Sequence, residues 1–422
     1  MYLKKIKHTF LYLICYSLLW IAYKNFVIVI GFAGFNWNPN TFKIIESMFL
    51  VFFLSLVLPS NINKPSDFFI HVHFLLPIIP MFVLYGGQDF SRLYIYFIAA
   101  SFLLVNYVRK FNLPNFNDGL FNLNRVLKTL LVIVVIHILS IVYQGGLQYL
   151  NFNLLKVYDF RSLASENLPG IYAYLSPLTS KVILPFIIII STYKKNWTYL
   201  TLGFIGSIMM FALTNNKGPL FYPILVFVIY AIMNKSQYKL IPLLIIAYIF
   251  SIVIPLSFYL LDNSLFLPGA FTFRRVYLAP ALLNFYYYDY FSTHPHILLA
   301  ESKLTFGLID YPYSLNSSRI IAYLYTKGSL TTGGANTGWL GSSYMNFGFS
   351  GMLIYAFIIG LILSIVDAFA QKKGLALIGS IIFIPLFILF ISADLPTAML
   401  NHGILLTLLL SWLSKFELNE SY

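Results

Sequence analysis

Apolar stretches of about twenty residues recur along the whole chain, and they restrict its possible folds more than any other feature. Each stretch, wound as a helix, is long enough to cross a hydrocarbon layer roughly 30 Å thick. Of the 422 residues, 59% are hydrophobic and 10% are charged, whereas soluble domains carry about 25% charged residues. The sequence therefore predicts an all-α polytopic membrane protein and argues against a soluble enzyme.

We expect about twelve transmembrane helices, which form a single integral membrane domain over residues 1–422. Two of them, at 197–213 and 219–234, are short and closely spaced, so a re-entrant hairpin is the alternative there. The basic N-terminus precedes an apolar run without a small-residue cleavage site, which indicates an uncleaved first span. The expected spans are 9–34, 41–59, 67–86, 90–108, 126–144, 175–193, 197–213, 219–234, 240–261, 343–368, 375–393 and 400–414.

The distribution of Lys and Arg at the span ends predicts the orientation of the chain, because cytoplasmic loops carry an excess of these residues. The short loops on the other side hold only Lys43, Arg92 and Lys217. Both termini are therefore expected in the cytoplasm. The cytoplasmic set is Lys4, Lys5, Lys7, Lys64, Arg109, Lys110, Arg125, Lys128, Lys194, Lys195, Lys235, Lys239, Lys372, Lys373 and Lys415.

The formal net charge of +13 is largely this topological bias. Such charges meet anionic lipid and hold the topology, and nothing in the pattern indicates binding to nucleic acid. The single cysteine, Cys15, lies within the first expected span. An intramolecular disulfide is therefore impossible, and thiol or iron–sulfur chemistry is not expected.

Two long segments, 145–174 and 262–342, are expected as large loops on the outer side of the membrane. Functional residues concentrate on loops that a rigid scaffold holds in place. Arg161 lies in the first segment, and Arg274 and Arg275 lie in the second. Topology alone does not call for arginines there, and Arg is suited to bidentate recognition of phosphate. The alternatives are contact with lipid headgroups and pairing with Asp159, Glu166 or Asp289.

The second segment also carries an aromatic run at 285–291 and two histidines, His294 and His296. The tyrosines suit an interfacial belt or, alternatively, a platform on which sugar rings stack. A general base near neutral pH is most often His, so His294 is the candidate base and Asp289 the reserve. Zinc usually takes three or four ligands, and Mg²⁺ sites use clustered acidic residues. Because neither pattern is present, no metal and no cofactor are expected.

The loops resemble those of the bacterial O-antigen and capsule repeat-unit polymerases, the Wzy type. These are membrane proteins of about a dozen spans with two functional outer loops. The expected order of spans and loops resembles that of the family over most of the chain, whereas the similar motifs cover only about sixty residues. The residues that carry it are 158–161, 273–281, 291–295 and 335–351, together with the turn at 214–219.

The resemblance implies a fold like that of class C glycosyltransferases and a location in a bacterial cytoplasmic membrane. It implies that two undecaprenyl-diphosphate-linked glycans react at the outer leaflet, so that the lipid diphosphate leaves and a hydroxyl of the incoming repeat unit attacks. Cationic side chains would stabilise charge on the departing diphosphate, in a reaction without metal. A chain-length regulator and a flippase are the implied partners. The implied substrate-binding residues are Arg161, Arg274, Arg275, Lys217, Tyr277 and Asn336.

Two other functions fit the same pattern. An O-antigen ligase shares the architecture and the outer arginines but transfers finished glycan to the lipid A core. A flippase or other transporter would show ionisable residues at the middle of its spans and short outer loops. The long second segment argues against a transporter.

We predict that Arg161→Ala and Arg275→Ala each abolish long-chain polysaccharide while the amount of protein in the membrane stays unchanged. Each change removes a cation that would stabilise the leaving diphosphate. The measurement is a gel of the polysaccharide beside an immunoblot of the membranes. Normal polymer from both variants would overturn the arginine assignment, and full polymer length in His294→Gln would remove His294 as base.

Overall fold

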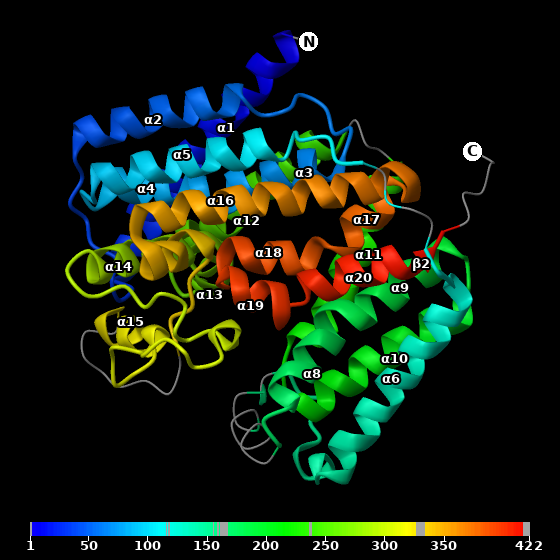
Figure 1. Cartoon of the computed structure of the whole chain (residues 1–422). Helices are drawn as coiled ribbons and strands as arrows, with labels where there is room; N and C mark the ends of the chain where they lie inside the picture. Colours follow the sequence, from blue (N-terminus) through cyan, green and yellow to red (C-terminus); the bar gives the residue numbers. More distant parts are fainter. Residues whose placement is uncertain are drawn as a thin grey trace. The chain divides into compact units, whose positions relative to one another are not determined.

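The chain is mostly helical in a computed structural model (Figure 1). The structure describes residues 2–416 apart from 115, 117–118, 155, 158–159, 161–167, 236–238 and 326–333. Its described strands are β1 (Phe121–Asn122) and β2 (Ser414–Lys415), which form one short parallel pair. In hydrocarbon each backbone N–H and C=O must find a partner inside the protein, and a helix provides that within one segment. The all-α class predicted from the sequence is confirmed.

The chain divides into two compact units. Unit 1 comprises residues 1–111, 238–364 and 387–396, and unit 2 comprises residues 112–237, 365–386 and 397–422. Unit 1 holds α1 (Tyr2–Ala22), η1 (Tyr23–Ile28), α2 (Thr41–Leu56), α3 (Pro65–His73), η2 (Phe74–Ile78), α4 (Ile79–Gly87), α5 (Arg92–Val108), α12 (Leu240–Leu261), α13 (Leu267–Gly269), η6 (Ala270–Leu278), α14 (Ala279–Phe291), η7 (Lys303–Thr305) and α15 (Ser317–Tyr325).

Unit 2 holds both strands and a second set of helices. Three helices contribute to both units: α16 (Trp339–Lys373), α18 (Phe383–Ile391) and α19 (Leu395–Leu400). The helices wholly within unit 2 are α6 (Leu123–Tyr143), η3 (Gly146–Tyr149), α8 (Tyr172–Leu178), η4 (Thr179–Ile183), α9 (Leu184–Tyr193), α10 (Trp197–Thr214), α11 (Gly218–Lys235), α17 (Leu375–Ile381) and α20 (Ile404–Leu413).

Nine continuous helical segments in the described part of the chain are long and apolar enough to cross a membrane. α10 and α11, with 18 residues each, are among them, so both are longer than the half-helices of a re-entrant hairpin. Three of the twelve expected spans fall on shorter helices: α2, α5 and the broken pair α17 and α18. The count of twelve therefore stays a prediction.

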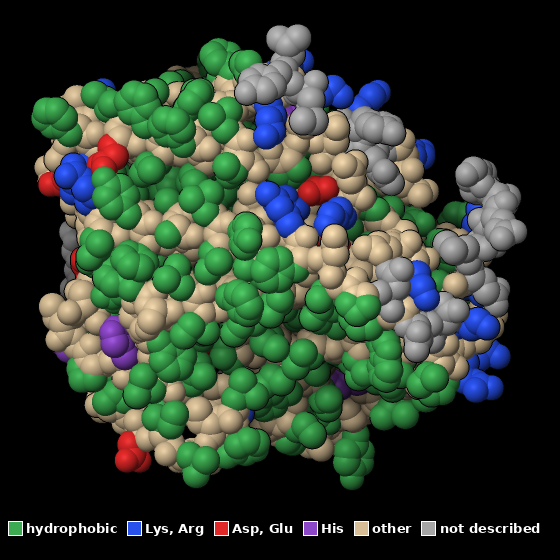
Figure 2. Space-filling model, turned by 45° about the horizontal axis from the view of Figure 1, so that its top comes forward, with side chains coloured by type: hydrophobic (Ala, Val, Ile, Leu, Met, Phe, Trp, Pro, Cys, Tyr) green, Lys and Arg blue, Asp and Glu red, His purple; other side chains and the backbone are tan. Residues whose placement is uncertain are grey.

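Apolar side chains cover much of the face shown in Figure 2, as expected of a protein that faces lipid. On α6 the exposed side chains include Val132, Val135, Ile136 and Leu139, which recur at the spacing of one helical face. Leu130, Val134 and His137 are buried on the other face. A large exposed apolar surface marks a membrane or protein interaction site. Together with the nine helices, it is consistent with a polytopic membrane protein.

The segment expected as the second outer loop is largely structured. α13, η6 and α14 follow one another without interruption from Leu267 to Phe291. This helical stretch packs into unit 1, where Phe273 meets Phe26 edge-on at 4.9 Å. α15 follows at Ser317–Tyr325. Residues 326–333 of the glycine-rich part lie outside the described residues.

Prolines explain two of the π-helical segments. Proline has no N–H to donate to the carbonyl four residues earlier, and a π-helix uses a wider, five-residue bond. Before Pro185, the N–H of Leu184 donates to the carbonyl of Thr179. Before Pro80, the N–H of Ile79 donates to the carbonyl of Phe74. Both segments interrupt candidate spans of regular helix.

A buried ion pair joins α3 to the end of α5. Nη1 of Arg109 lies 2.7 Å from a carboxylate oxygen of Asp67, and both side chains are almost fully buried. The guanidinium also donates to Ser66 and Asn106, and Asp67 accepts from the backbone N–H of Asn63 and Lys64. The pair thus fixes the start of α3 against α5.

We predict that Asp67→Asn lowers the free energy of unfolding by about 3–5 kcal/mol, because it leaves the Arg109 guanidinium buried without its counter-ion. Thermal unfolding of the purified protein in detergent measures this. The control is Asp89→Asn, which removes the more exposed pair between Lys43 and Asp89 and should cost less than about 1 kcal/mol. Equal losses in the two variants would contradict the prediction.

Candidate functional site

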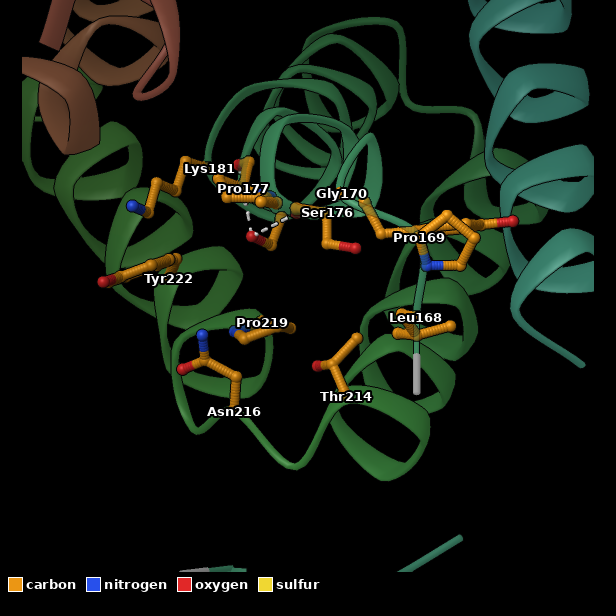
Figure 3. Close-up of a pocket in the computed structure, with 13 residues that line it drawn as sticks. Leu168, Pro169, Gly170, Ser176, Pro177, Lys181, Thr214, Asn216, Pro219 and Tyr222 are labelled. Carbon is orange, nitrogen blue, oxygen red and sulfur yellow. Dashed lines mark hydrogen bonds between the residues drawn. The ribbon is translucent and has the colours of Figure 1, made fainter. Parts of the chain in front are cut away.

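A pocket of about 260 Å³ lies in unit 2, between the end of the first outer segment and the turn that joins α10 to α11 (Figure 3). No Asp or Glu is among its described lining residues, which include Lys181 and several hydroxyl groups. Those residues are Leu168, Pro169, Gly170, Tyr172, Ala173, Ser176, Pro177, Ser180, Lys181, Thr214, Asn216, Pro219 and Tyr222.

Lys181 reaches the pocket from η4, the π-helical segment that Pro185 imposes on the candidate span Tyr172–Tyr193. Its Nζ lies 2.7 Å from Nδ1 of His402, which follows α19. Such π-helical turns occur frequently at functional sites. Lys181 was not among the residues predicted from the sequence. A lysine within an apolar stretch nevertheless marks a candidate functional residue.

The turn at 214–218 is tied to the start of the first outer segment through Asn215. This buried residue adopts a left-handed conformation with φ +50°. Its side chain accepts from Asn151 at 2.9 Å and donates to the carbonyl of Tyr149 at 2.8 Å. The start of the first outer segment is thus bonded to this turn, and its end lines the same pocket as Thr214 and Asn216 of the turn.

The described cationic residues predicted from the sequence are divided between the two units. Arg274 lies over the ring of Phe32, with 4.5 Å between Cζ and the ring centre, and Arg275 is exposed on η6. Both belong to unit 1, whereas Lys217 belongs to unit 2, in the turn whose Asn216 and Pro219 line the pocket. Arg161 lies outside the described residues.

The other two predicted binding residues have different surroundings. Tyr277 is buried; its ring stacks on Tyr248 and its hydroxyl lies 2.6 Å from that of Ser251. These contacts make Tyr277 part of the packing between η6 and α12. Asn336 is exposed, shortly before α16 begins.

His294, the predicted base, is exposed just after α14. Its ring stacks flat on Tyr290 at 4.0 Å, and Nδ1 lies 2.9 Å from the carbonyl of Tyr290. Because a carbonyl only accepts, Nδ1 carries the proton and Nε2 holds the lone pair of the neutral ring. Asp289, the reserve candidate, is an exposed residue of α14, and partial desolvation raises the pKa of its carboxyl.

The aromatic run at 285–291 is mostly used inside the protein. The hydroxyl of Tyr286 donates to the carbonyl of Gly34, and that of Tyr287 donates to the carbonyl of Ala335. Tyr288 stacks on Tyr94 and accepts from Ser91. These contacts favour a packing role for the three tyrosines over a platform for sugar rings.

Asp394 lies in unit 1, at the break between α18 and α19. It was not among the site residues predicted from the sequence. Asp394 accepts from the N–H of Leu395 at 2.8 Å. Burial raises its pKa to about 6, although hydrogen bonds from Ser342 and Tyr355 oppose that rise. The carboxylate of Glu301, which accepts from the N–H and hydroxyl of Ser317, lies near enough to raise it further.

In the part of the chain that the structure describes, no three His, Cys, Asp or Glu side chains gather closely enough to hold a metal ion. Comparison of the chain with models of protein families, with curated proteins and with solved structures gives no match.

Asp394 makes stability depend on pH. Its folded pKa of about 6 lies above the value of about 3.9 in an unfolded chain, so the folded state holds this proton to higher pH. Stability therefore falls as pH rises from about 4 to 6 and stays lower above that range.

We predict that Asp394→Asn raises the free energy of unfolding by about 2 kcal/mol at pH 7.5, because the amide cannot ionise. The difference from the wild type should shrink toward zero as the pH approaches 4. Thermal unfolding in detergent across this range measures it. A difference that is constant with pH, or a variant less stable at pH 7.5, would contradict the assignment.

Proposed function

We propose that this chain is a glycosyltransferase of the repeat-unit polymerase kind. It joins undecaprenyl-diphosphate-linked oligosaccharides into O-antigen or capsular polysaccharide at the outer leaflet of a bacterial cytoplasmic membrane. The reaction needs no metal ion. The proposal starts from the resemblance in the outer segments, and the pocket in unit 2 supports it.

The pocket is the observation that carries the proposal. It is lined by the end of the first outer segment and by residues of the turn that contains Lys217. Its described lining is more apolar than polar but includes Lys181 and several hydroxyl groups, and a lysine can donate a charge-assisted hydrogen bond to a phosphate. Drug-sized ligands occupy pockets of about 300–1,000 Å³, so this smaller volume suits a charged headgroup better than an oligosaccharide.

The proposed chemistry assigns separate tasks to the chain's own residues. An acceptor hydroxyl oxygen attacks the anomeric carbon of the donor glycan, the bond from that carbon to the lipid diphosphate breaks, and the hydroxyl proton goes to a base. Nε2 of His294 is the candidate acceptor for the proton, with Asp289 as the reserve. Arg161, Arg275 and Lys217 are the candidates for stabilising the departing diphosphate, as the resemblance implies.

One observation favours a transporter as the second candidate. Lys181 and His402 lie within the candidate spans Tyr172–Tyr193 and Leu395–Leu413, and ionisable groups at such positions mark substrate pathways in transporters. A flippase for lipid-linked oligosaccharide would bind the same diphosphate but would leave the glycan unchanged. An O-antigen ligase would instead transfer the glycan to the lipid A core.

We predict that the purified protein converts lipid-linked repeat unit into a ladder of longer glycans, and that EDTA leaves the ladder unchanged. The ladder is measured on a gel after mild acid releases the glycans. Boiled protein is the control for the substrate's own reactivity. Glycan that stays one unit long with active protein would contradict the polymerase, and transfer only to added lipid A core would identify a ligase.

A further inference from the structure

One face of α12 exposes large apolar side chains along the whole helix. Their positions differ by three or four residues, which is the spacing of a single helical face. α12 is also one of the candidate spans, Leu240–Leu261. An exposed apolar surface of this size marks a membrane or protein contact, and on a candidate span we assign it to lipid. Its residues are Leu243, Ile246, Phe250, Ile254, Phe258 and Leu261.

The segment that follows α12, beginning with α13, returns along the same helix. The ring of Phe26 meets Tyr259 of α12 at 4.8 Å and Phe273 of η6 at 4.9 Å. One turn after Phe273, the hydroxyl of Tyr277 lies 2.6 Å from that of Ser251. η6 therefore packs beside the last turns of α12, and Ser251 is about 15 Å of helix from the end of that span.

The exposed side of α13 and η6 combines two large apolar residues with an arginine. Leu267 is 53% exposed and Phe271 is 59% exposed, and Arg275 is exposed as well. The three are four residues apart, so they lie on one side of this helical stretch. Phe273 and Tyr277 are buried and form the packed side. This composition is typical of a helix at a membrane surface, where apolar side chains enter the lipid and a cation stays at the headgroups.

The position of η6 favours lipid over water as the surroundings of this exposed side. Because η6 packs beside the end of a candidate span, its exposed residues lie at the level of the membrane surface. Leu260, Leu261 and Leu265 are exposed as well. Exposed apolar side chains thus continue along the chain from the lipid-facing side of α12 to Phe271.

The two neighbouring arginines have different surroundings. The guanidinium of Arg274 lies over the ring of Phe32, inside unit 1, whereas Arg275 lies on the exposed side. A guanidinium keeps its charge and can donate two hydrogen bonds to one phosphate. Its long side chain can also reach the headgroup layer while its apolar stem stays in the lipid. The exposed side of η6 therefore suits a lipid that carries a phosphate.

From this geometry we infer that α13 and η6 lie in the surface of the bilayer, with Leu267 and Phe271 among the acyl chains and Arg275 on the phosphate of a phospholipid. The segment expected as an outer loop then begins as a membrane-surface helix that extends the lipid contact of α12. The inference goes beyond the proposed function and does not depend on the proposed reaction. The diphosphate of a lipid-linked glycan lies in the same layer, and competition separates it from a phospholipid.

Spin labels at single introduced cysteines test the position of the helix. Cys15 is the only cysteine of the chain and is buried, so the label modifies an exposed introduced cysteine selectively. In vesicles of phosphatidylglycerol and phosphatidylcholine, labels at Leu267→Cys and Phe271→Cys should relax faster with oxygen, which concentrates in lipid, than with a water-soluble nickel complex. Ile254→Cys, on the lipid-facing side of α12, is the positive control.

The matched control for water is Asn263→Cys, in the exposed turn between α12 and α13, where the nickel complex should act more strongly than oxygen. If Phe271→Cys responds like Asn263→Cys, the helix faces water and the inference is overturned. A label at Phe271 that neither reagent reaches would overturn it too, because another protein surface would then cover this side.

A phosphatidylglycerol with a photoreactive headgroup tests the phosphate contact. It should modify the stretch 267–275 of the unaltered full-length protein, and a diacylglycerol with the same group but no phosphate should modify it severalfold less. Arg275→Gln should lower the yield severalfold and Arg275→Lys should restore part of it, because a charge-assisted hydrogen bond is lost and then regained. The matched control Lys303→Gln, which removes an exposed cation of the same unit, should leave the yield unchanged.

Equal yields from the two lipids on the unaltered protein would overturn the phosphate contact without the use of any variant. A yield that Arg275→Gln leaves unchanged would overturn the role of Arg275. Farnesyl diphosphate, a water-soluble prenyl diphosphate, should not lower the yield at the concentration of the photoreactive lipid. Complete displacement of the lipid at that concentration would overturn the phospholipid assignment in favour of a prenyl diphosphate site.

Discussion

The lack of water in hydrocarbon is the constraint on which the rest of this structure depends. Every backbone N–H and C=O at that depth needs a protein partner, and the chain meets this need with helices almost throughout. The same constraint makes each interruption of a helix informative. At η4 and at the break between α18 and α19, polar side chains occupy the positions where regular helix stops.

The two helix interruptions hold different ionisable side chains, a lysine in unit 2 and a carboxylate in unit 1. In unit 2, η4 carries Lys181, which contacts His402 and lines a pocket together with the end of the first outer segment. In unit 1, the break before α19 holds Asp394 beside hydroxyls of α16 and the carboxylate of Glu301. The first interruption holds a lysine, and the second holds a carboxyl group whose pKa burial raises to about 6. Both are built from segments distant in sequence.

The fold class could be predicted because hydrophobic length is a local property that each span shows by itself. The helical structure of Leu267–Phe291 could not be predicted, because Arg274 and Arg275 interrupt the apolar pattern of this stretch. The helices are held by packing against residues such as Phe26. The role of Tyr277 could not be predicted for the same reason. Its hydrogen bond to Ser251 depends on tertiary structure, whereas the sequence shows only an aromatic residue close to two arginines. Lys181 is unusual in the sequence because it is a lysine within an apolar stretch, but its contact with His402 depends on tertiary structure.

We propose that the pocket of unit 2 receives the diphosphate of a lipid-linked glycan. Photo-crosslinking tests it most directly: a prenyl diphosphate with a photoreactive group beside the phosphates is bound to the protein and irradiated, and the modified peptides are identified. We expect crosslinks in the segments 168–181 and 214–222, which contain the lining residues of the pocket. These crosslinks should disappear when unlabelled farnesyl diphosphate competes for the site. Competable crosslinks confined to other segments would contradict it.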